Sequence, residues 1–249
     1  MSDLTAGRDR IYEGKAKVVF PGDNPGEVYM LFKDSATAFD GKKKGTIKGK
    51  GHFNAQISTI LFRYLEDHGV RTHFVSLDDE VTMRVKRLRI FPVEVVVRNI
   101  VAGSLSKRTG RPEGVDLPFP ILEFYYKSDE LGDPMLNDDH VLALGLATSD
   151  QLDHLRNEAK RINAILRPFF LERGLLLVDF KLEFGRVVEA KDGAETLGEI
   201  VLGDEISPDT CRFWDARTRE KLDKDRFRRD LGGVEEAYAE VLRRVSCKQ

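Results

Sequence analysis

The segment at residues 175–184, LLLVDFKLEF, constrains the fold most strongly, because an apolar run leads directly into three evenly spaced charges. Side chains along a β-strand alternate between its two faces. A strand here directs its apolar side chains to one face, namely Val178, Phe180, Leu182 and Phe184. Its other face carries Asp179, Lys181 and Glu183. Because unpaired buried charges are strongly unfavourable, this interior strand predicts a polar cleft along its charged face, with an exposed amphipathic strand as the alternative.

A second acidic segment, IVLGDEISPD at residues 200–209, is an apolar strand that ends in Asp204 and Glu205. If the strands at 176–188 and 197–206 pair as a hairpin, Glu183 and Asp204 come close together. Adjacent carboxylates repel each other unless a cation lies between them, and Mg²⁺ binds through one or two carboxylates together with substrate phosphates. The pair therefore predicts a magnesium site for a nucleotide, although surface ion-pair networks also gather acidic residues.

Two groups of cationic residues predict anion binding. The tetrapeptide from Gly14 to Lys17 combines a turn with Lys15 and Lys17 on one strand face, which suits phosphate oxygens. It is not a P-loop, because no G-x-x-x-x-G-K-[ST] is present, and a solvated hairpin is the simpler explanation of the tetrapeptide taken alone. The arginines suit phosphate and carboxylate because the guanidinium is a planar fork. The second group comprises Arg98 at the end of an apolar strand, Ser104 in a turn of small residues, Arg212, and the run DRFRR at 225–229. For Arg98, a buried ion pair with Asp or Glu is an equally good explanation.

Strands are predicted through the first hundred residues from apolar runs and from alternation of apolar and polar side chains. They lie at 10–20, bent around Gly14, at 28–32, at 81–86, and at 93–97 after an interruption at Pro92. The segment at 40–52 is rich in lysine and glycine and lacks apolar side chains, so we predict a surface loop there.

Helices are predicted where apolar residues recur at helical spacing. The first carries Phe53 to Leu65 and ends near Gly69. The longest begins at a capping box of Thr148 and Gln151 and stops at Gly174, with a kink expected at Pro168. The last helix carries Val234, Tyr238, Val241 and Val245. We predict irregular binding loops at 103–140, which hold several prolines and glycines. Because strands and helices do not alternate regularly, the order favours an α+β fold.

The composition limits the classes of function. The chain of 249 residues is long enough for one large domain or two lobes, and its net charge of -2 argues against a protein that coats nucleic acid or an anionic membrane. Cys211 and Cys247 are far apart, so we expect no disulfide framework and no zinc site. No apolar run reaches the ~20 residues that span a bilayer. We therefore expect a cytoplasmic protein.

The chain resembles the phosphoribosylaminoimidazole-succinocarboxamide synthase (SAICAR synthetase) family in seven stretches that follow one another through nearly its whole length. The most specific are EVVVRNIVAGS at 94–104 and GDEISPDTCRFWD at 203–215. The others are YEGKAK at 12–17, KGTIKGKG at 44–51, EFYYKSDELGDP at 123–134, LVDFKLEFG at 177–185 and DKDRFRRDLGG at 223–233. The turn at 189–198 is longer than this resemblance leads us to expect, but it touches none of these motifs.

The resemblance implies an ATP-dependent ligase that condenses 5-phosphoribosyl-5-aminoimidazole-4-carboxylate (CAIR) with L-aspartate through an acyl phosphate. The products would be SAICAR, ADP and phosphate, in de novo purine (IMP) biosynthesis. It also implies two lobes with ATP in the cleft between them. These are a β-rich nucleotide-binding lobe at residues 1–90, with an antiparallel sheet, and an α+β lobe at 91–249 for substrate and metal. The oligomeric state is left open, with a homodimer as one option.

The resemblance also implies a role for each site residue. Gly14, Lys15, Lys17, Lys86 and Lys127 would bind the nucleotide, and Glu183 and Asp204 would hold Mg²⁺. Arg98, Ser104, Arg212 and Arg226 would bind CAIR. Lys181 would act beside the reacting groups, and Asp40 would border the substrate cleft.

Two other functions are compatible with parts of the sequence. A kinase-like phosphotransferase would share the ATP lobe and the acidic pair, but it would need no aspartate. A nucleotide-binding or RNA-binding module without catalysis is suggested only by the lysines at 42–50. The near-zero net charge argues against the RNA-binding alternative.

Overall fold

The computed structural model describes residues 3–38, 43–191 and 194–247. It contains two main antiparallel sheets, which we call the small sheet and the large sheet. The small sheet has the strand order β1-β2-β3-β7-β6. Its strands are β1 (Tyr12–Glu13), β2 (Lys17–Pro21), β3 (Glu27–Phe32), β6 (Phe74–Leu77) and β7 (Thr82–Lys86). Every pair of neighbours in this sheet is antiparallel. The predicted strands at 10–20, 28–32 and 81–86 are therefore confirmed.

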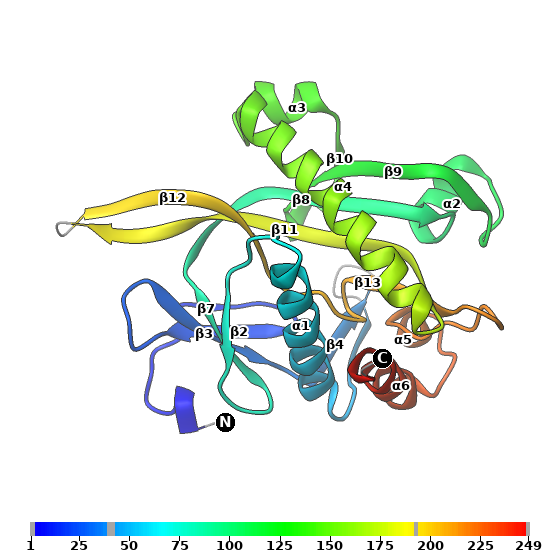
Figure 1. Ribbon diagram of the computed structural model, residues 1–249, viewed down its shortest axis with the longest axis horizontal. Coiled ribbons are helices and arrows are strands. Elements are labelled where there is room, and N and C mark those ends of the chain that lie inside the picture. Colours follow the sequence, from blue (N-terminus) through cyan, green and yellow to red (C-terminus); the bar gives the residue numbers. More distant parts are fainter. Residues whose placement is uncertain (1–2, 39–42, 192–193, 248–249) are drawn as a thin grey trace.

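The large sheet has the order β10-β9-β8-β11-β12, with β13 paired to the first part of β11. Its strands are β8 (Leu88–Ile100), β9 (Asp116–Tyr126), β10 (Met135–Leu136), β11 (Leu175–Lys191), β12 (Ala194–Gly203) and β13 (Cys211–Asp215). The predicted hairpin is confirmed as β11 and β12, and Figure 1 shows these two strands extending to the left beyond β8 and β9. Strand β11 occupies the centre of the sheet, because β8 pairs with one edge of it and β12 and β13 pair with the other.

Three long helices cover the sheets. They are α1 (Lys50–Asp67), α4 (Ser149–Glu172) and α6 (Val234–Ser246). Figure 1 shows α4 across the large sheet and α1 between the two sheets, with α6 beside α1. The capping box at Thr148 and Gln151 is confirmed, and Gly174, with a φ of 69°, follows the last turn of α4. The short elements are η1 (Asp3–Thr5), β4 (Ser35–Ala38), β5 (Lys43–Thr46), α2 (Gly103–Thr109), η2 (Asp129–Leu131), α3 (Asp138–Ala143) and α5 (Asp225–Arg228).

One hydrophobic cluster joins the two sheets. It includes Met30 of the small sheet, Leu61 of α1, Leu166 of α4, Phe180 of β11 and Val241 of α6. The predicted α+β class is confirmed, because antiparallel sheets and helices build this core without regular βα alternation. The predicted boundary after residue 90 stays a prediction, although the chain does enter the large sheet at Leu88.

Three local predictions were wrong. The region 103–140 is not irregular, because it contains α2, the eleven-residue strand β9, β10 and α3. Pro92 does not interrupt the chain, since β8 runs through it. The loop expected at 40–52 is partly strand β5 and partly the start of α1, and Lys50 is fully buried. The prolines and lysines of these segments favour loops locally, so the sequence did not predict the elements. Pairing with neighbouring strands and ion pairs outweighed this local preference.

The alternation along β11 also differs from the prediction at one residue. A register shift lies between Leu177 and Asp179 on the side that pairs with β13. Phe180 therefore packs in the main core, whereas Val178 packs in a separate cluster with Ile100 and Trp214. An extra residue in one strand reverses the faces that follow, so Val178 does not share a face with Phe180 as predicted.

No helix in the described part of the chain combines the length and apolar character needed to cross a membrane.

Candidate active site

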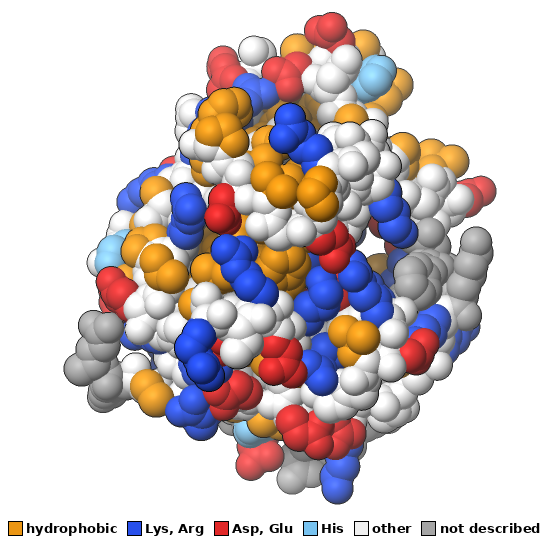
Figure 2. Space-filling model, turned by 90° about the vertical axis from the view of Figure 1, so that its right-hand side faces the viewer, with side chains coloured by type: hydrophobic (Ala, Val, Ile, Leu, Met, Phe, Trp, Pro, Cys, Tyr) orange, Lys and Arg blue, Asp and Glu red, His pale blue; other side chains and the backbone are white. Residues whose placement is uncertain are grey.

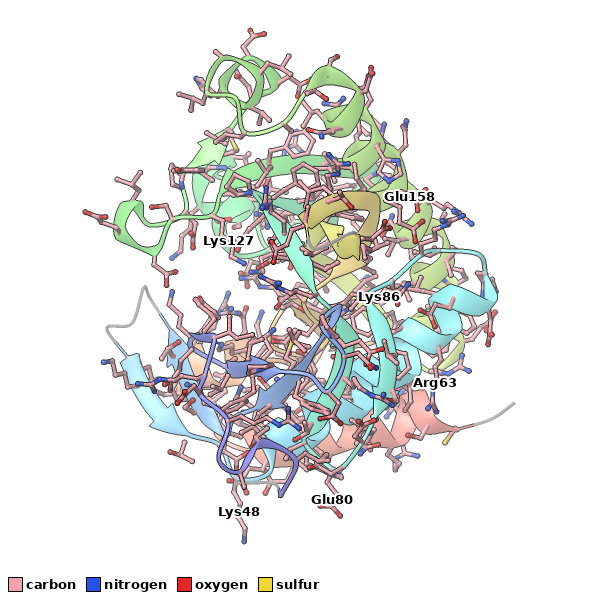
Figure 3. The ribbon with its side chains drawn as sticks, turned by 90° about the vertical axis from the view of Figure 1, so that its left-hand side faces the viewer. Lys48, Arg63, Glu80, Lys86, Lys127 and Glu158 are labelled. Atoms are coloured by element: carbon pink, nitrogen blue, oxygen red, sulfur yellow. The ribbon has the colours of Figure 1, made fainter. Side chains whose placement is uncertain are left out.

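A cleft of about 700 Å³ opens between the small and the large sheet. Strands β2, β3 and β7 line one side of it, and β8 and β11 line the other. Figure 3 shows Lys127 on the large-sheet side of the opening and Lys86 where the two sheets approach each other. Part of the lining is apolar, and it includes Val19, Val28, Met30, Val85, Leu88 and Ile90. A ligand with a flat ring and a charged tail fits an apolar wall next to a charged one.

The charged face of β11 points into this cleft, as the sequence predicted. The Lys181 ammonium donates to Glu94 at 2.6 Å and to Glu183 at 2.9 Å. Lys127 forms a second ion pair with Glu183. Burial would raise the pKa of Glu183, but the ammonium groups of Lys181 and Lys127 hold this pKa well below its ordinary value. Burial likewise opposes the charge of Lys181, yet Glu183 and Glu94 raise its pKa. Both groups are therefore ionised at neutral pH.

Asp204 reaches the cleft from the end of β12. Its neighbour Gly203 pairs with Glu183 across the hairpin, which places the two predicted metal ligands on adjacent strands. Asp204 has a φ of 58°, a left-handed conformation that aspartate adopts more readily than most residues and that is frequent at functional sites. The Lys17 ammonium forms ion pairs with both Asp204 and Glu205, the latter at 2.6 Å.

The donor set of this cleft fits Mg²⁺ bound together with a nucleotide. Glu183 and Asp204 offer hard carboxylate oxygens to the same cleft. Within residues 3–38, 43–191 and 194–247, no three His, Cys, Asp or Glu side chains gather into a metal-binding group. A cage made of protein groups alone does not fit, whereas Mg²⁺ typically takes one or two carboxylates and completes its shell with phosphates and water.

A second charged region of the cleft is built around Asp179. Its carboxylate accepts from Arg98 at 2.9 Å and from Arg212 at 2.9 and 3.0 Å. Arg98 also donates to Ser104 Oγ at 2.9 Å and to Glu123 at 2.7 Å. Figure 2 shows lysine and arginine side chains gathered beside a hollow on the face that carries α2 and α5. The fixed guanidiniums are suited to holding an anionic substrate.

The ion-pair explanation of Arg98 is confirmed, and its role in binding an anionic ligand stays a prediction. Its guanidinium is buried and paired with carboxylates, and it also lines the cleft. Burial opposes the charge of Arg98, but Asp179 and Glu123 raise its pKa.

The structure brings most of the predicted site residues to this cleft. Those that line it are Gly14, Lys15, Lys17, Lys86, Arg98, Lys127, Lys181, Glu183, Asp204 and Arg212. Ser104 touches the site through Arg98. Asp40 lies outside the described residues.

Arg226 is not brought to the cleft lining. Its guanidinium donates to Glu220 at 2.7 Å and to the carbonyl oxygen of Gly232 at 2.7 Å. Arg228, two residues later on the short helix α5, lines the cleft instead. The sequence DRFRR offers three arginines, and only the direction in which α5 faces decides which one enters the site.

Asp209 is a buried node that the sequence analysis did not assign to the site. It accepts from Lys50 at 2.8 Å, from the hydroxyl of Tyr238 at 2.6 Å and from Lys224 at 3.4 Å. Burial would raise the pKa of Asp209, but Lys224 and Lys50 hold it far below its ordinary value. The node ties α1 and α6 to the cleft, which Asp209 and Lys224 line. Other lining groups without a predicted role are Glu94, Asp179, Glu205 and Thr210.

Glu113 links the two segments that carry the arginine region. It accepts from the backbone N–H of Gly103 at 3.1 Å, from Arg229 at 3.0 Å and from Lys221 at 3.3 Å. The hydrogen bond from Arg229 is the main reason that the pKa of Glu113 is lowered to about 2 from an ordinary 4.5. Glu113 therefore links Gly103, the first residue of α2, to Lys221 and Arg229, which lie on either side of α5.

Replacing Glu113 with glutamine is expected to lower the free energy of unfolding by about 1 kcal/mol at pH 7, a screened value because the group is partly exposed. A carboxylate whose folded pKa lies below its unfolded pKa stabilises the protein above the unfolded value. The difference between wild type and variant should be complete above pH 4.5 and vanish as the pH falls to about 2. Urea unfolding at several pH values measures it. A difference independent of pH would contradict the assignment.

The chain is similar to known proteins over nearly its whole length. The protein-family model described as SAICAR synthetase matches residues 10–245 of this chain. The phosphoribosylaminoimidazole-succinocarboxamide synthase of Coprothermobacter proteolyticus is 56% identical over 239 residues, covering 96% of this chain and 98% of that protein. The crystal structure of the synthase of the same name from Ehrlichia chaffeensis has a TM-score of 0.91 at 45% identity, covering 97% of this chain and 100% of that one. A structure of SAICAR synthetase in complex with ADP has a TM-score of 0.88 at 50% identity, covering 97% and 99%.

Proposed function

This chain belongs to the SAICAR synthetase family, and on that premise we propose which of its residues carry each part of the reaction. The chain is an ATP-dependent ligase of purine biosynthesis that condenses CAIR with L-aspartate to give SAICAR, ADP and phosphate. One observation of the structure supports this function above others. A single cleft joins a region of lysines and carboxylates to a region of paired arginines, which suits a ligase whose nucleotide and imidazole carboxylate are both anionic.

The nucleotide is assigned to the side of the cleft formed by the small sheet. Its ring lies against the apolar wall, and its phosphates lie near Lys15 and Lys17, with Gly14 at the turn and Lys86 and Lys127 beside them. Residues 1–90 form the nucleotide lobe, and residues 91–249 form the lobe for substrate and metal. Glu183 and Asp204 would hold Mg²⁺, which would neutralise charge on the phosphates.

CAIR is assigned to the arginine region. Arg98 and Arg212 hold its anionic groups, Ser104 fixes Arg98, and Arg228 takes the place predicted for Arg226. Lys181 lies between the two regions, bound to Glu94 and Glu183. From this position its ammonium stabilises the charge that develops on the phosphoryl group during transfer. Asp40 is proposed to border the substrate cleft, as the sequence analysis expects.

The chemistry proceeds in two steps because a carboxylate repels an attacking amine. In the first step a carboxylate oxygen of CAIR takes the terminal phosphoryl group of ATP, which gives an acyl phosphate and ADP. In the second step the amine of L-aspartate attacks the acyl carbon. A C–N bond forms, the bond from this carbon to the bridging phosphate oxygen breaks, and phosphate leaves together with one proton lost from the amine. The cleft contributes positioning and fixed charge.

The cytoplasm is the proposed location of the enzyme. Cys211 and Cys247 are free thiols, which is compatible with a reducing compartment. A homodimer is the proposed assembly, to be tested by sedimentation.

Release of ADP is expected only when CAIR and L-aspartate are both supplied with Mg²⁺ and ATP, with one SAICAR formed for each ADP. Coupled measurement of ADP together with chromatography of the product tests this. A kinase-like phosphotransferase would release ADP whether or not aspartate is present. Release of ADP at the full rate without aspartate would therefore replace the ligase with that alternative.

A further inference from the structure

Two arginines that line the cleft share a carboxylate that does not line it. Asp225, the first residue of α5, accepts from Arg212 Nε at 3.1 Å and from Arg228 Nη1 at 2.7 Å, with one oxygen for each guanidinium. Arg212 and Arg228 belong to the cleft lining, whereas Asp225 does not, and only 2% of its side chain is exposed. A group in this position acts on a ligand through the two arginines.

The guanidinium of Arg212 is held on three sides. Its Nη1 donates to Asp179 at 2.9 and 3.0 Å, and its Nε donates to Asp225. The third side is Gly103, where a Cβ atom would lie 2.5 Å from Arg212 Nη2, so a larger residue would displace the guanidinium. Arg212 therefore has little freedom to turn.

Asp225 also fixes which arginine of α5 enters the cleft. Residues three apart on a helix are neighbours, and Arg228 is the arginine at this spacing from Asp225. Arg226 follows Asp225 directly and instead donates to Glu220 and to the carbonyl oxygen of Gly232. Arg228 uses only Nη1 for Asp225, and its Nε and Nη2 have no hydrogen-bond partner among the described residues, which leaves them to a ligand.

A second acid beside Asp225 takes the proton that the pair holds most readily. The buried carboxylate of Asp223 accepts from the backbone N–H of Asp225 at 2.7 Å. Burial and the charge of Asp225 raise the pKa of Asp223 to about 7. Burial opposes the charge of Asp225 as well, but Arg212 and Arg228 lower its pKa to about 2. Asp225 is therefore ionised at neutral pH, and both arginines keep their anionic partner.

Resting on the proposed function, we propose that Asp225 is a positioning residue for CAIR. It holds Arg212 and Arg228 as a fixed pair that faces an anionic group of this substrate. A guanidinium that is already in place loses little side-chain freedom when it binds phosphate or carboxylate. Removing the carboxylate of Asp225 should therefore weaken the binding of CAIR and leave the binding of ADP unchanged.

Isothermal titration with CAIR in the absence of ATP tests the proposal without the reaction. Asp225→Asn should raise the Kd for CAIR at least about tenfold, which corresponds to the loss of one charge-assisted hydrogen bond. Titration with ADP should give the wild-type Kd. Asp225→Glu keeps the charge and should recover part of the affinity for CAIR. Glu220→Gln is the matched control, because it removes the carboxylate bound to Arg226, which does not line the cleft.

Double variants show whether Asp225 acts through the arginines. Arg228→Met alone should also weaken the binding of CAIR. Adding Asp225→Asn to Arg228→Met should then cost less than it costs in wild type, because one of the two guanidiniums that Asp225 holds is already gone. An equal loss in both backgrounds, or a wild-type Kd for CAIR in Asp225→Asn, would overturn the positioning role.

Arg212→Met separates this proposal from the proposed function. If Arg212→Met leaves the Kd for CAIR unchanged, CAIR does not bind in the arginine region and the proposed site itself is wrong. If Arg212→Met weakens the binding of CAIR and Asp225→Asn does not, the site stands and only the role of Asp225 is wrong.

A crystal structure of the wild-type protein with CAIR decides the matter even if Asp225→Asn does not fold. Arg212 and Arg228 should both contact the ligand while they keep their hydrogen bonds to Asp225. A guanidinium that leaves Asp225 in order to reach CAIR would overturn the proposal.

Discussion

Replacing Lys181 with methionine is expected to lower turnover by roughly 10²–10³-fold, the usual loss when one preorganised charge is removed from a transition state. The ammonium of Lys181 is fixed by Glu94 at 2.6 Å and by Glu183 at 2.9 Å, between the nucleotide region and the arginine region. It meets the transferring phosphoryl group with its position already set. Steady-state formation of SAICAR measures the effect, and the KM for ATP should change much less than kcat.

Glu183→Gln tests the same face of β11 from the metal side and should also lose most turnover. Lys160→Met provides the matched control, because it removes an exposed lysine of α4 that is not among the residues lining the cleft. Circular dichroism checks that each variant is folded. If Lys181→Met keeps turnover within about threefold of wild type while folded, the role given to the charged face of β11 is wrong.

Replacing Arg98 with methionine is expected to lower the free energy of unfolding by about 3–5 kcal/mol, the usual cost of removing one partner from a buried ion pair. The side chain of Arg98 is 4% exposed and pairs with Glu123 and Asp179, which are themselves buried. Removing Arg98 leaves the buried charges of both carboxylates with fewer cationic partners. Urea denaturation measures the loss, and the midpoint should fall without a large change in slope.

The conservative variant Arg98→Lys separates stability from binding. It keeps the charge and should recover part of the lost stability, but a lysine cannot reproduce the fork that reaches Asp179, Glu123 and Ser104 together. The KM of Arg98→Lys for CAIR should therefore be higher than that of the wild type. Arg243→Met is the control for an exposed pair, since Arg243 is 64% exposed and pairs only with Glu240. An unchanged unfolding midpoint in Arg98→Met would contradict the prediction.

The periodic elements were predictable because their signals are local. Helix α4 begins at the capping box of Thr148 and ends before Gly174, as the sequence indicates. The hairpin of β11 and β12 follows from two apolar strands, but the turn expected at 189–198 is wrong in its length, because most of that segment pairs as strand. Strand β9 was missed because its prolines and exposed side chains resemble a loop, and only pairing with β8 makes it a strand.

In the candidate site too, some features were predictable from local sequence and others depended on tertiary packing. Alternation on one strand was enough to place Lys181 and Glu183 on a common polar face, because side-chain direction on a strand depends on position alone. The choice between Arg226 and Arg228 was not predictable, since it depends on how α5 is held against the rest of the protein. The same is true of Lys50, whose burial requires Asp209 from a segment 159 residues away.

Sequence alone therefore determined the chemical character of this protein, which is a cleft in which acidic residues lie beside lysines and arginines. Tertiary structure decided which charges meet. Lys17 binds Asp204 and Glu205, and Arg98 shares Asp179 with Arg212, through contacts between residues far apart in the chain. The physical reason is that strand and helix periodicity are properties of neighbouring residues, whereas the partner of a buried charge is selected by the packing of the whole core.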